Sequence, residues 1–237
     1  MRWGVLLAAL PLMLSLAGCE HLPGAAAAAG TAPRPDQMMD FTTLYASNCQ
    51  ACHGANGHNG PAIDHANPGF QALLDDATLR RIISNGMPGT QMPAFAQSAG
   101  GMLTDAEIDA IVAGMRSEWA KPNAFGGATP PPFQQPAGGD VKRGEQVYQA
   151  RCANCHQKPQ DQQVTSPAYL SLVSDQALRT IIIAGRPDIG QPDWRMQDTK
   201  GGGSAGGPLS AQDVTDLVTY LGSLRNPAAV SAAPVGR

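Results

Sequence analysis

Two short motifs combine residues that can hold a redox cofactor. Four of the five cysteines stand in CQACH at Cys49–His53 and in CANCH at Cys152–His156. Two thiols separated by two residues can each form a thioether to a haem vinyl group, and the histidine that follows then lies under the iron as its proximal ligand. Disulfides or a zinc site would use the cysteines but leave the histidine after each pair unexplained. The motifs therefore predict two covalent haem c groups, attached through Cys49, Cys52, His53, Cys152, Cys155 and His156.

The surroundings of the two motifs match each other, so the chain is a tandem repeat. A short amphipathic segment precedes each motif, with Tyr45 or Tyr148 four residues before the first cysteine. Further along are DDATLRRIISNG at 75–86 and SDQALRTIIIAG at 174–185. We expect both to form helices that stop at their final glycines, Gly86 and Gly185.

A second helical segment closes each copy, LTDAEIDAIVAGM at 103–115 and LSAQDVTDLVTYL at 209–221. Thr104 and Ser210 are N-cap candidates, each followed three residues later by an acid. Apolar residues recur with helical spacing at Ile108, Ile111, Val112 and Met115, and at Val214, Leu217, Val218 and Leu221. We expect both stripes to pack in a core.

With these motifs the chain resembles the class I cytochrome c family, and more closely its dihaem members. The resemblance covers about 36–121 and 139–226. It implies an all-α fold of two tandem domains, each a small helical fold around one covalent haem c, and an electron-carrying role. It also implies that a proline carbonyl after each motif, that of Pro61 or Pro167, accepts a hydrogen bond from the ligand histidine. Many members have a glycine in the first helix where the last helix crosses it. Gly144 fits this pattern but Phe41 does not, so we expect a looser crossing in the first domain.

The resemblance implies a methionine as the sixth iron ligand, between the middle and last helices. In the first copy, GMPGTQMPAF offers Met92, six residues beyond Gly86, whereas Met87 has too little chain to reach across the haem. The same count from Gly185 arrives at Gln191. We expect His53 and Met92 to bind the first iron and His156 and Met196 to bind the second. The alternatives for the second iron are Gln191, directly or through a water, and an open site with Lys200 as a remote candidate.

Two arginines occupy equivalent places in the copies, Arg80 and Arg179. We expect them to pair with haem propionates.

The N-terminus has the layout of an export signal, with Arg2 before an apolar run that is too short to span a membrane. It ends in LAGC at 16–19, which resembles the lipobox of bacterial lipoproteins, so Cys19 is the expected lipidation site. We divide the chain into a signal peptide at 1–18, a lipidated flexible tether at 19–35 and a first cytochrome c domain at 36–121. A Pro/Gly-rich linker at 122–138, a second domain at 139–226 and a disordered tail at 227–237 follow.

The net charge of −3, without a basic run, argues against nucleic acid as a partner. We expect an exported, lipid-anchored dihaem cytochrome, with its haem domains in the periplasm or outside the cytoplasmic membrane. Its expected role is electron transfer between respiratory or photosynthetic chain components. The expected partners are a quinol-oxidising complex, a dehydrogenase, an oxidase or a soluble cytochrome. The alternative is a dihaem peroxidase-like enzyme with an open or weakly ligated second haem, although the second copy lacks a further histidine. A haem-based sensor is a third, weaker interpretation.

Overall fold

The computed structural model describes residues 34–156, 162–196 and 207–225. Within these ranges the regular elements are helices, and no β-strand occurs. The predicted all-α fold is therefore confirmed. From Asp36 onward the described residues belong to one compact unit. No helix in the described part of the chain has the length and apolar character needed to cross a membrane.

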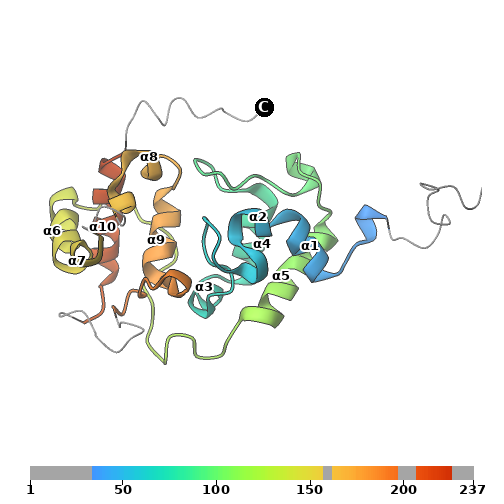
Figure 1. Cartoon of the computed structure of the whole chain (residues 1–237), viewed down its shortest axis with the longest axis horizontal. Coiled ribbons are helices and arrows are strands. Elements are labelled where there is room, and N and C mark those ends of the chain that lie inside the picture. Colours follow the sequence, from blue (N-terminus) through green and yellow to red (C-terminus); the bar gives the residue numbers. More distant parts are fainter. Residues whose placement is uncertain (1–33, 157–161, 197–206, 226–237) are drawn as a thin grey trace, which may run out of the picture. The chain divides into compact units, whose positions relative to one another are not determined.

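The first repeat runs from a helix that precedes the CQACH motif to a long closing helix (Figure 1). Its α-helices are α1 (Phe41–Asn48), α2 (Gln50–His53), α3 (Pro68–Leu73), α4 (Asp76–Asn85) and α5 (Asp105–Trp119). The predicted stop of α4 is confirmed, because Gly86 follows it with φ of 69°. A residue with a side chain is strained in that conformation.

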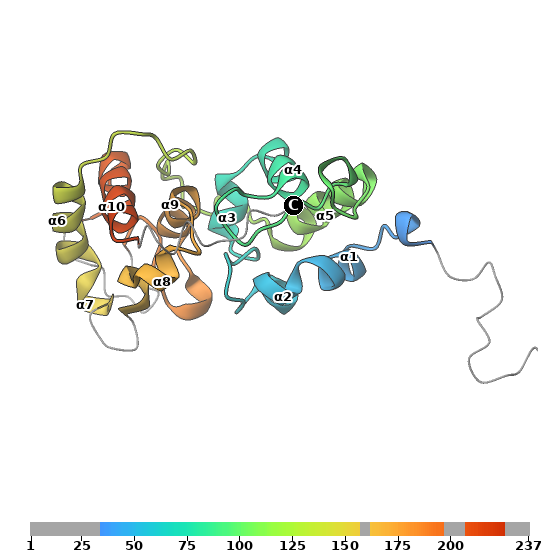
Figure 2. The same cartoon turned by 90° about the horizontal axis from the view of Figure 1, so that it is seen from above.

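The second repeat follows the same order (Figure 2). Its α-helices are α6 (Val141–Arg151), α7 (Ala153–His156), α8 (Pro167–Leu170), α9 (Asp175–Ala184) and α10 (Ala211–Ser223). Both predicted capping boxes are present, Thr104 with Glu107 on α5 and Ser210 with Asp213 on α10. Each box satisfies backbone N–H groups that a helix start leaves unpaired.

Two hydrophobic clusters form the core. One contains the predicted stripe of α5, the other contains the stripe of α10, and all eight stripe residues are buried. The clusters do not follow the repeats strictly. Ala184, at the end of α9, belongs to the first cluster, and Leu73 of α3 packs against both. The two repeats therefore share a packed border.

The first and last helices of each repeat cross at a glycine. This glycine lies on the last helix of the first repeat and on the first helix of the second repeat. A Cβ on Gly144 of α6 would lie 2.0 Å from the carbonyl oxygen of Asp216 and 2.7 Å from the Cβ of Tyr220 on α10. The expected close crossing of α6 and α10, which lie side by side in both views, is confirmed. In the first repeat the glycine is Gly114 of α5, where a Cβ would lie 2.1 Å from Cγ of Phe41.

Phe41 is the positional counterpart of Gly144, and Gly114 is that of Tyr220. Each repeat therefore pairs one glycine with one aromatic ring, from opposite helices. The rings contact equivalent tyrosines in similar geometry. Phe41 lies 5.6 Å from Tyr45 at 50°, and Tyr220 lies 5.7 Å from Tyr148 at 45°. The volume lost on one helix is thus supplied by the other.

Candidate haem-binding sites

The first CxxCH motif forms the short helix α2, immediately after α1. The backbone N–H of Cys49 donates to the carbonyl of Tyr45 at 2.9 Å, which continues the helical path into the motif. Cys52 is exposed and Cys49 is partly buried. In the second repeat Cys152 makes the same bond to Tyr148 at 2.8 Å, and Cys155 is exposed. The two motifs are therefore held by the same local structure.

All four motif cysteines are free thiols, so the structure does not form the alternative disulfides. Burial raises the pKa of Cys49 to about 12 and that of Cys152 to about 11. Both groups are therefore protonated at neutral pH, because burial disfavours the charged thiolate. The described residues contain no group of three or more His, Cys, Asp or Glu side chains that could hold a metal ion.

His53 is oriented as an axial ligand requires. Its ring is 8% exposed, and its Nδ1 lies 2.8 Å from the carbonyl oxygen of Ile63. A carbonyl can only accept, so Nδ1 carries the proton and Nε2 keeps a free lone pair for iron. Burial is the main cause that lowers the pKa of His53, which favours the neutral, ligating ring.

A second histidine supports this ring. His65 stacks on His53 with ring centroids 3.6 Å apart and planes at 18°. Nδ1 of His65 lies 3.1 Å from the hydroxyl of Tyr45, which ties the stack to α1. Burial lowers the pKa of His65 well below its usual value, so two neutral rings can stack without charge repulsion. Sequence reasoning missed His65, because its stacking on His53 depends on the path of the loop between them.

The predicted role of Pro61 is wrong in this structure. The acceptor for His53 is the carbonyl of Ile63, two residues further on. The N–H of Ala62 donates to the carbonyl of Cys52 at 3.0 Å and folds the loop back onto the motif. The carbonyl of Ile63, the residue after Ala62, is therefore the one that faces the imidazole of His53.

Pro167 is the first residue of α8, and its carbonyl accepts from the N–H of Ser171 within that helix. Its hydrogen bond to His156 stays a prediction.

One buried polar atom of the second repeat, Nε1 of Trp194, also fits a bound haem. The indole Nε1 of Trp194 is buried and has no hydrogen-bond partner among the described residues. Such a donor costs free energy unless an acceptor meets it, and a haem propionate is an acceptor of suitable charge. The chemistry of both motifs, the free lone pair of His53 and this unmatched donor agree with covalent haem c in each repeat.

The loops expected to carry the sixth ligands have the same backbone design. The N–H of Met87 donates to the carbonyl of Met92 at 3.1 Å, and the N–H of Arg186 donates to that of Gln191 at 3.0 Å. A Cβ on Gly86 would lie 2.6 Å from the Met92 carbonyl oxygen, and one on Gly185 would lie 3.0 Å from that of Gln191. Gln191 thus occupies the backbone position in the second repeat that is equivalent to that of Met92 in the first.

Gln191 and Met196, the two candidate ligands of the second iron, differ in burial. The Gln191 amide donates weakly, over 3.4 Å, to the carbonyl of Ile181. Met196 is buried in the second cluster, against which Cys152 packs, and has φ of 57°. A non-glycine residue in the left-handed region is held there by its surroundings. Lys200 and Cys19 lie outside the described residues, and so do the expected signal peptide at 1–18 and the expected tail at 227–237.

Both arginines that are expected to pair with propionates also have protein partners. Nε of Arg80 lies 2.5 Å from Oδ1 of Asp109, so it joins α4 to α5. Arg179 is 1% exposed and donates to the carbonyl of Pro132 at 2.7 Å and to Thr215 at 3.2 Å. It therefore holds the linker against α9 and α10. Their pairing with haem propionates stays a prediction.

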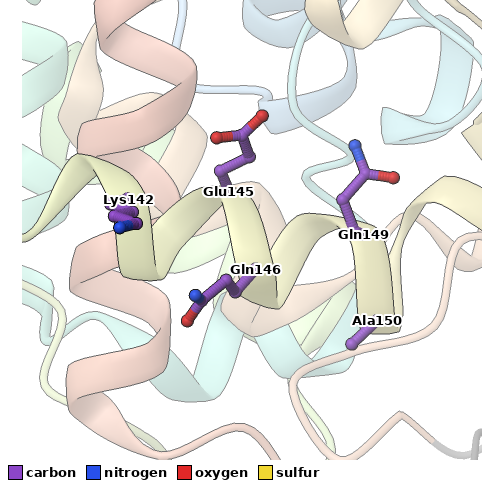
Figure 3. Close-up of a pocket in the computed structure, with 5 residues that line it drawn as sticks. All are labelled: Lys142, Glu145, Gln146, Gln149 and Ala150. Carbon is purple, nitrogen blue, oxygen red and sulfur yellow. The ribbon is translucent and has the colours of Figure 1, made fainter.

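A surface pocket lies on one face of α6 (Figure 3). It is lined by Lys142, Glu145, Gln146, Gln149 and Ala150. This spacing places all five on one helix face. The pocket contains no cysteine or histidine, so it is not a haem site.

Comparisons with known proteins agree with the two-repeat organisation. The family model for cytochrome C oxidase, cbb3-type, subunit III matches residues 36–113, and the model for cytochrome c matches residues 141–225. These matches fall within the two domain ranges expected from the sequence.

Curated relatives match parts of the chain. A dihydro-heme d1 dehydrogenase from Pseudomonas aeruginosa is 43% identical over 94 residues, 39% of this chain and 16% of the relative. A cytochrome bc1 complex cytochrome c subunit from Mycobacterium tuberculosis is 29% identical over 117 residues, 48% of this chain and 40% of the relative. A cbb3-type cytochrome c oxidase subunit CcoP from Azospirillum sp. is 29% identical over 137 residues, 50% of this chain and 39% of the relative.

The chain thus spans 40% or less of the length of these relatives. No solved structure gives a significant match. The paired motifs, the helical repeats and the two family matches agree, and the chain therefore belongs to the cytochrome c family, with two cytochrome c domains in tandem.

Proposed function

We propose that the protein is a membrane-tethered dihaem electron carrier that passes electrons between components of a respiratory or photosynthetic chain. The main support is the pair of CxxCH motifs on matching helices. In the first motif, His53 is buried and neutral, and its ring is oriented by a hydrogen bond to the carbonyl of Ile63. Bound haem supplies one-electron chemistry. Ile63 and His65 hold the ring of the ligand His53.

Redox partner proteins follow from the same proposal. Curated relatives are a bc1-complex subunit, a cbb3-oxidase subunit and a dehydrogenase, which supports a partner of one of these classes. Export and a lipid anchor at Cys19 rest on the sequence LAGC alone. The anchor would keep both haem domains close to membrane complexes outside the cytoplasm.

For the first iron we propose His53 and Met92 as the axial pair. For the second we propose His156 and Met196. The burial and left-handed backbone of Met196 support it over Gln191, whose side-chain oxygen is a harder and weaker ligand for haem iron. A thioether with an imidazole favours ferrous iron and raises the potential.

A second candidate function is a peroxidase-like activity at the second haem. The observation that favours it is the glutamine at the backbone place of Met92. Against it, His156 is the only histidine after residue 65 in the whole sequence. A distal histidine that could move a proton is therefore lacking in the second repeat.

The test is a redox titration of the full dihaem protein with and without carbon monoxide. Under the carrier proposal neither ferrous haem binds the gas readily, and Met196→Ala lowers the second potential and opens that haem to it. Met102→Ala is the matched control, since this methionine is 81% exposed. Rapid gas binding by the unmodified protein, with no effect of Met196→Ala, would exclude Met196 and support the peroxidase-like alternative.

A further inference from the structure

The two repeats are joined by a buried side chain next to the first haem-attachment loop. Asn67 precedes α3 and is 4% exposed. Its Oδ1 accepts from the N–H of Gly69 at 2.8 Å and caps the helix. Its Nδ2 donates to the carbonyls of Ala184 at 2.8 Å and Gly185 at 3.1 Å. One amide group therefore starts a helix in the first repeat and satisfies the end of α9 in the second.

An arginine makes the return contact. Arg186 is 7% exposed, and its Nη2 donates to the carbonyl of Gly60 at 3.0 Å. The same guanidinium holds Asp188 through Nε at 2.8 Å and Nη2 at 2.7 Å. Asp188 in turn accepts from the N–H of Asn59 at 3.1 Å. A planar guanidinium can meet a carboxylate and a carbonyl together, which a lysine ammonium cannot do in the same geometry.

The first-repeat side of these contacts is the haem-attachment segment itself. Gly60 packs so closely that a Cβ on it would lie 2.3 Å from the carbonyl oxygen of Cys52 and 2.5 Å from the carbonyl carbon of His53. Asn67 lies four residues beyond Ile63, whose carbonyl aims the His53 ring. Both partners are therefore built on the loop that orients the proximal ligand.

The second-repeat side is the loop that leads to Met196, the proposed sixth ligand. Arg186 and Gln191 exchange backbone hydrogen bonds of 3.0 and 2.9 Å, which close the loop between them. Gly185, which binds Asn67, has φ of 73° and packs against the Gln191 and Pro192 backbone. A shift at Ala184 or Gly185 would move the whole closed loop, since the start of the loop is fixed by these residues.

We propose that Asn67 and Arg186 are positioning residues through which the first repeat holds the 186–191 loop of the second. The contacts join the proximal-ligand loop of one haem to the segment that leads to the sixth ligand of the other. The environment of the second haem then depends on a first-repeat side chain. This inference rests on the proposed function only in taking Met196, five residues beyond this loop, as a ligand of the second iron.

Asn67→Asp is the informative variant. It keeps the oxygen that caps α3 and replaces the donor by an oxygen that faces two carbonyls. The variant loses buried hydrogen bonds and adds repulsion between oxygens. We therefore expect the equilibrium constant for local opening of the 184–191 backbone to rise roughly ten- to a hundredfold. Asn85→Asp is the control, because it makes the same change at an exposed site of the first repeat.

The experiment uses the full dihaem protein and two readouts. Hydrogen exchange of peptides covering 184–191 reports the loop, and a spectroscopic redox titration with carbon monoxide reports the second haem. We expect Asn67→Asp to raise exchange and to shift the second potential or increase gas binding, while Asn85→Asp does neither. Arg186→Lys, on the second-repeat side of the contact, should also raise exchange at 184–191 and shift the second potential or increase gas binding.

Unchanged exchange in Asn67→Asp would overturn the proposal, and so would faster exchange with an unaltered second haem. If Asn67→Asp fails to fold, Asn67→Ser provides the test, because serine also caps helices but lacks the amide N–H groups that reach Ala184 and Gly185. Hydrogen exchange does not require that the haems carry electrons to a partner. Failure of the electron-carrier proposal would therefore leave this readout valid.

Discussion

Exchange of the glycine and the aromatic ring between helices gives a sharp test of how each repeat packs. Gly114→Tyr places a second ring where Phe41 already lies, because even a Cβ there would be 2.1 Å from the Phe41 ring. Phe41→Gly removes the ring that contacts Tyr45 and Trp119. The double variant recreates in the first repeat the arrangement of Gly144 and Tyr220 in the second.

The size of each effect follows from the packing. Complete truncation of a buried phenylalanine costs about 3–5 kcal/mol, and Phe41 is only partly buried, so we expect about 3 kcal/mol for Phe41→Gly. Overpacking by Gly114→Tyr should cost about 1–3 kcal/mol or more, since the Phe41 Cβ also lies within 2.6 Å of the added Cβ. In the double variant the new ring occupies the vacated volume. We therefore expect a favourable coupling free energy of about 2 kcal/mol.

The assay is urea unfolding of the full dihaem protein, followed by circular dichroism, as a double-mutant cycle. The control is Gly144→Ala, which meets the backbone carbonyl of Asp216 and cannot be relieved by trimming a side chain. If the free-energy losses of Phe41→Gly and Gly114→Tyr simply add, the ring and the glycine do not share one space and the argument is refuted.

Three further outcomes are expected. Burial raises the pKa of Asp64, so its ionised form destabilises the fold at pH 7. Asp64→Asn should raise the free energy of unfolding there, with an advantage that shrinks as the pH falls through the raised pKa; a gain that grows on acidification would contradict this sign. Cys19→Ser should move the protein from the membrane fraction to the soluble fraction, unless another attachment retains it. Cys152→Ala with Cys155→Ala should leave one covalent haem per chain by mass spectrometry and a folded first domain; loss of both haems would show that the repeats depend on each other for maturation.

Local patterns predicted the helices and the attachment motifs well. The stops at Gly86 and Gly185, the caps at Thr104 and Ser210 and the apolar stripes all agree with the structure. These features depend on residues within one or two turns of each other, so the sequence contains what is needed. The register of Gln191 against Met92 was predictable for the same reason, because both are counted from a helix-ending glycine.

Side-chain partners across the fold were less predictable. Arg80 and Arg179 stand at equivalent positions, yet one pairs with Asp109 and the other with a linker carbonyl. Their partners come from segments whose approach depends on packing. The acceptor for His53 moved from Pro61 to Ile63 because one backbone hydrogen bond sets the path of the loop.

A comparison of the copies could have indicated the junction between the repeats. The loop residues at 87–92 are MPGTQM and those at 186–191 are RPDIGQ. Both loops close with the same backbone hydrogen bond, so the differing side chains are not required for the turn. In the second copy, the arginine and aspartate instead bind Gly60 and Asn59 of the first repeat.

The loop therefore closes with one shared backbone hydrogen bond but makes a different set of contacts in each repeat. In the first repeat its final residue is a methionine beside an otherwise uncharged turn. In the second, a buried ion pair fixes the turn against the neighbouring repeat, and the methionine sulfur occurs five residues later, at Met196. A residue with φ of 57° in a hydrophobic cluster needs surroundings that hold it there. The preceding chain is fixed at both Arg186 and Gln191, and this constraint helps to set the path that leads to Met196.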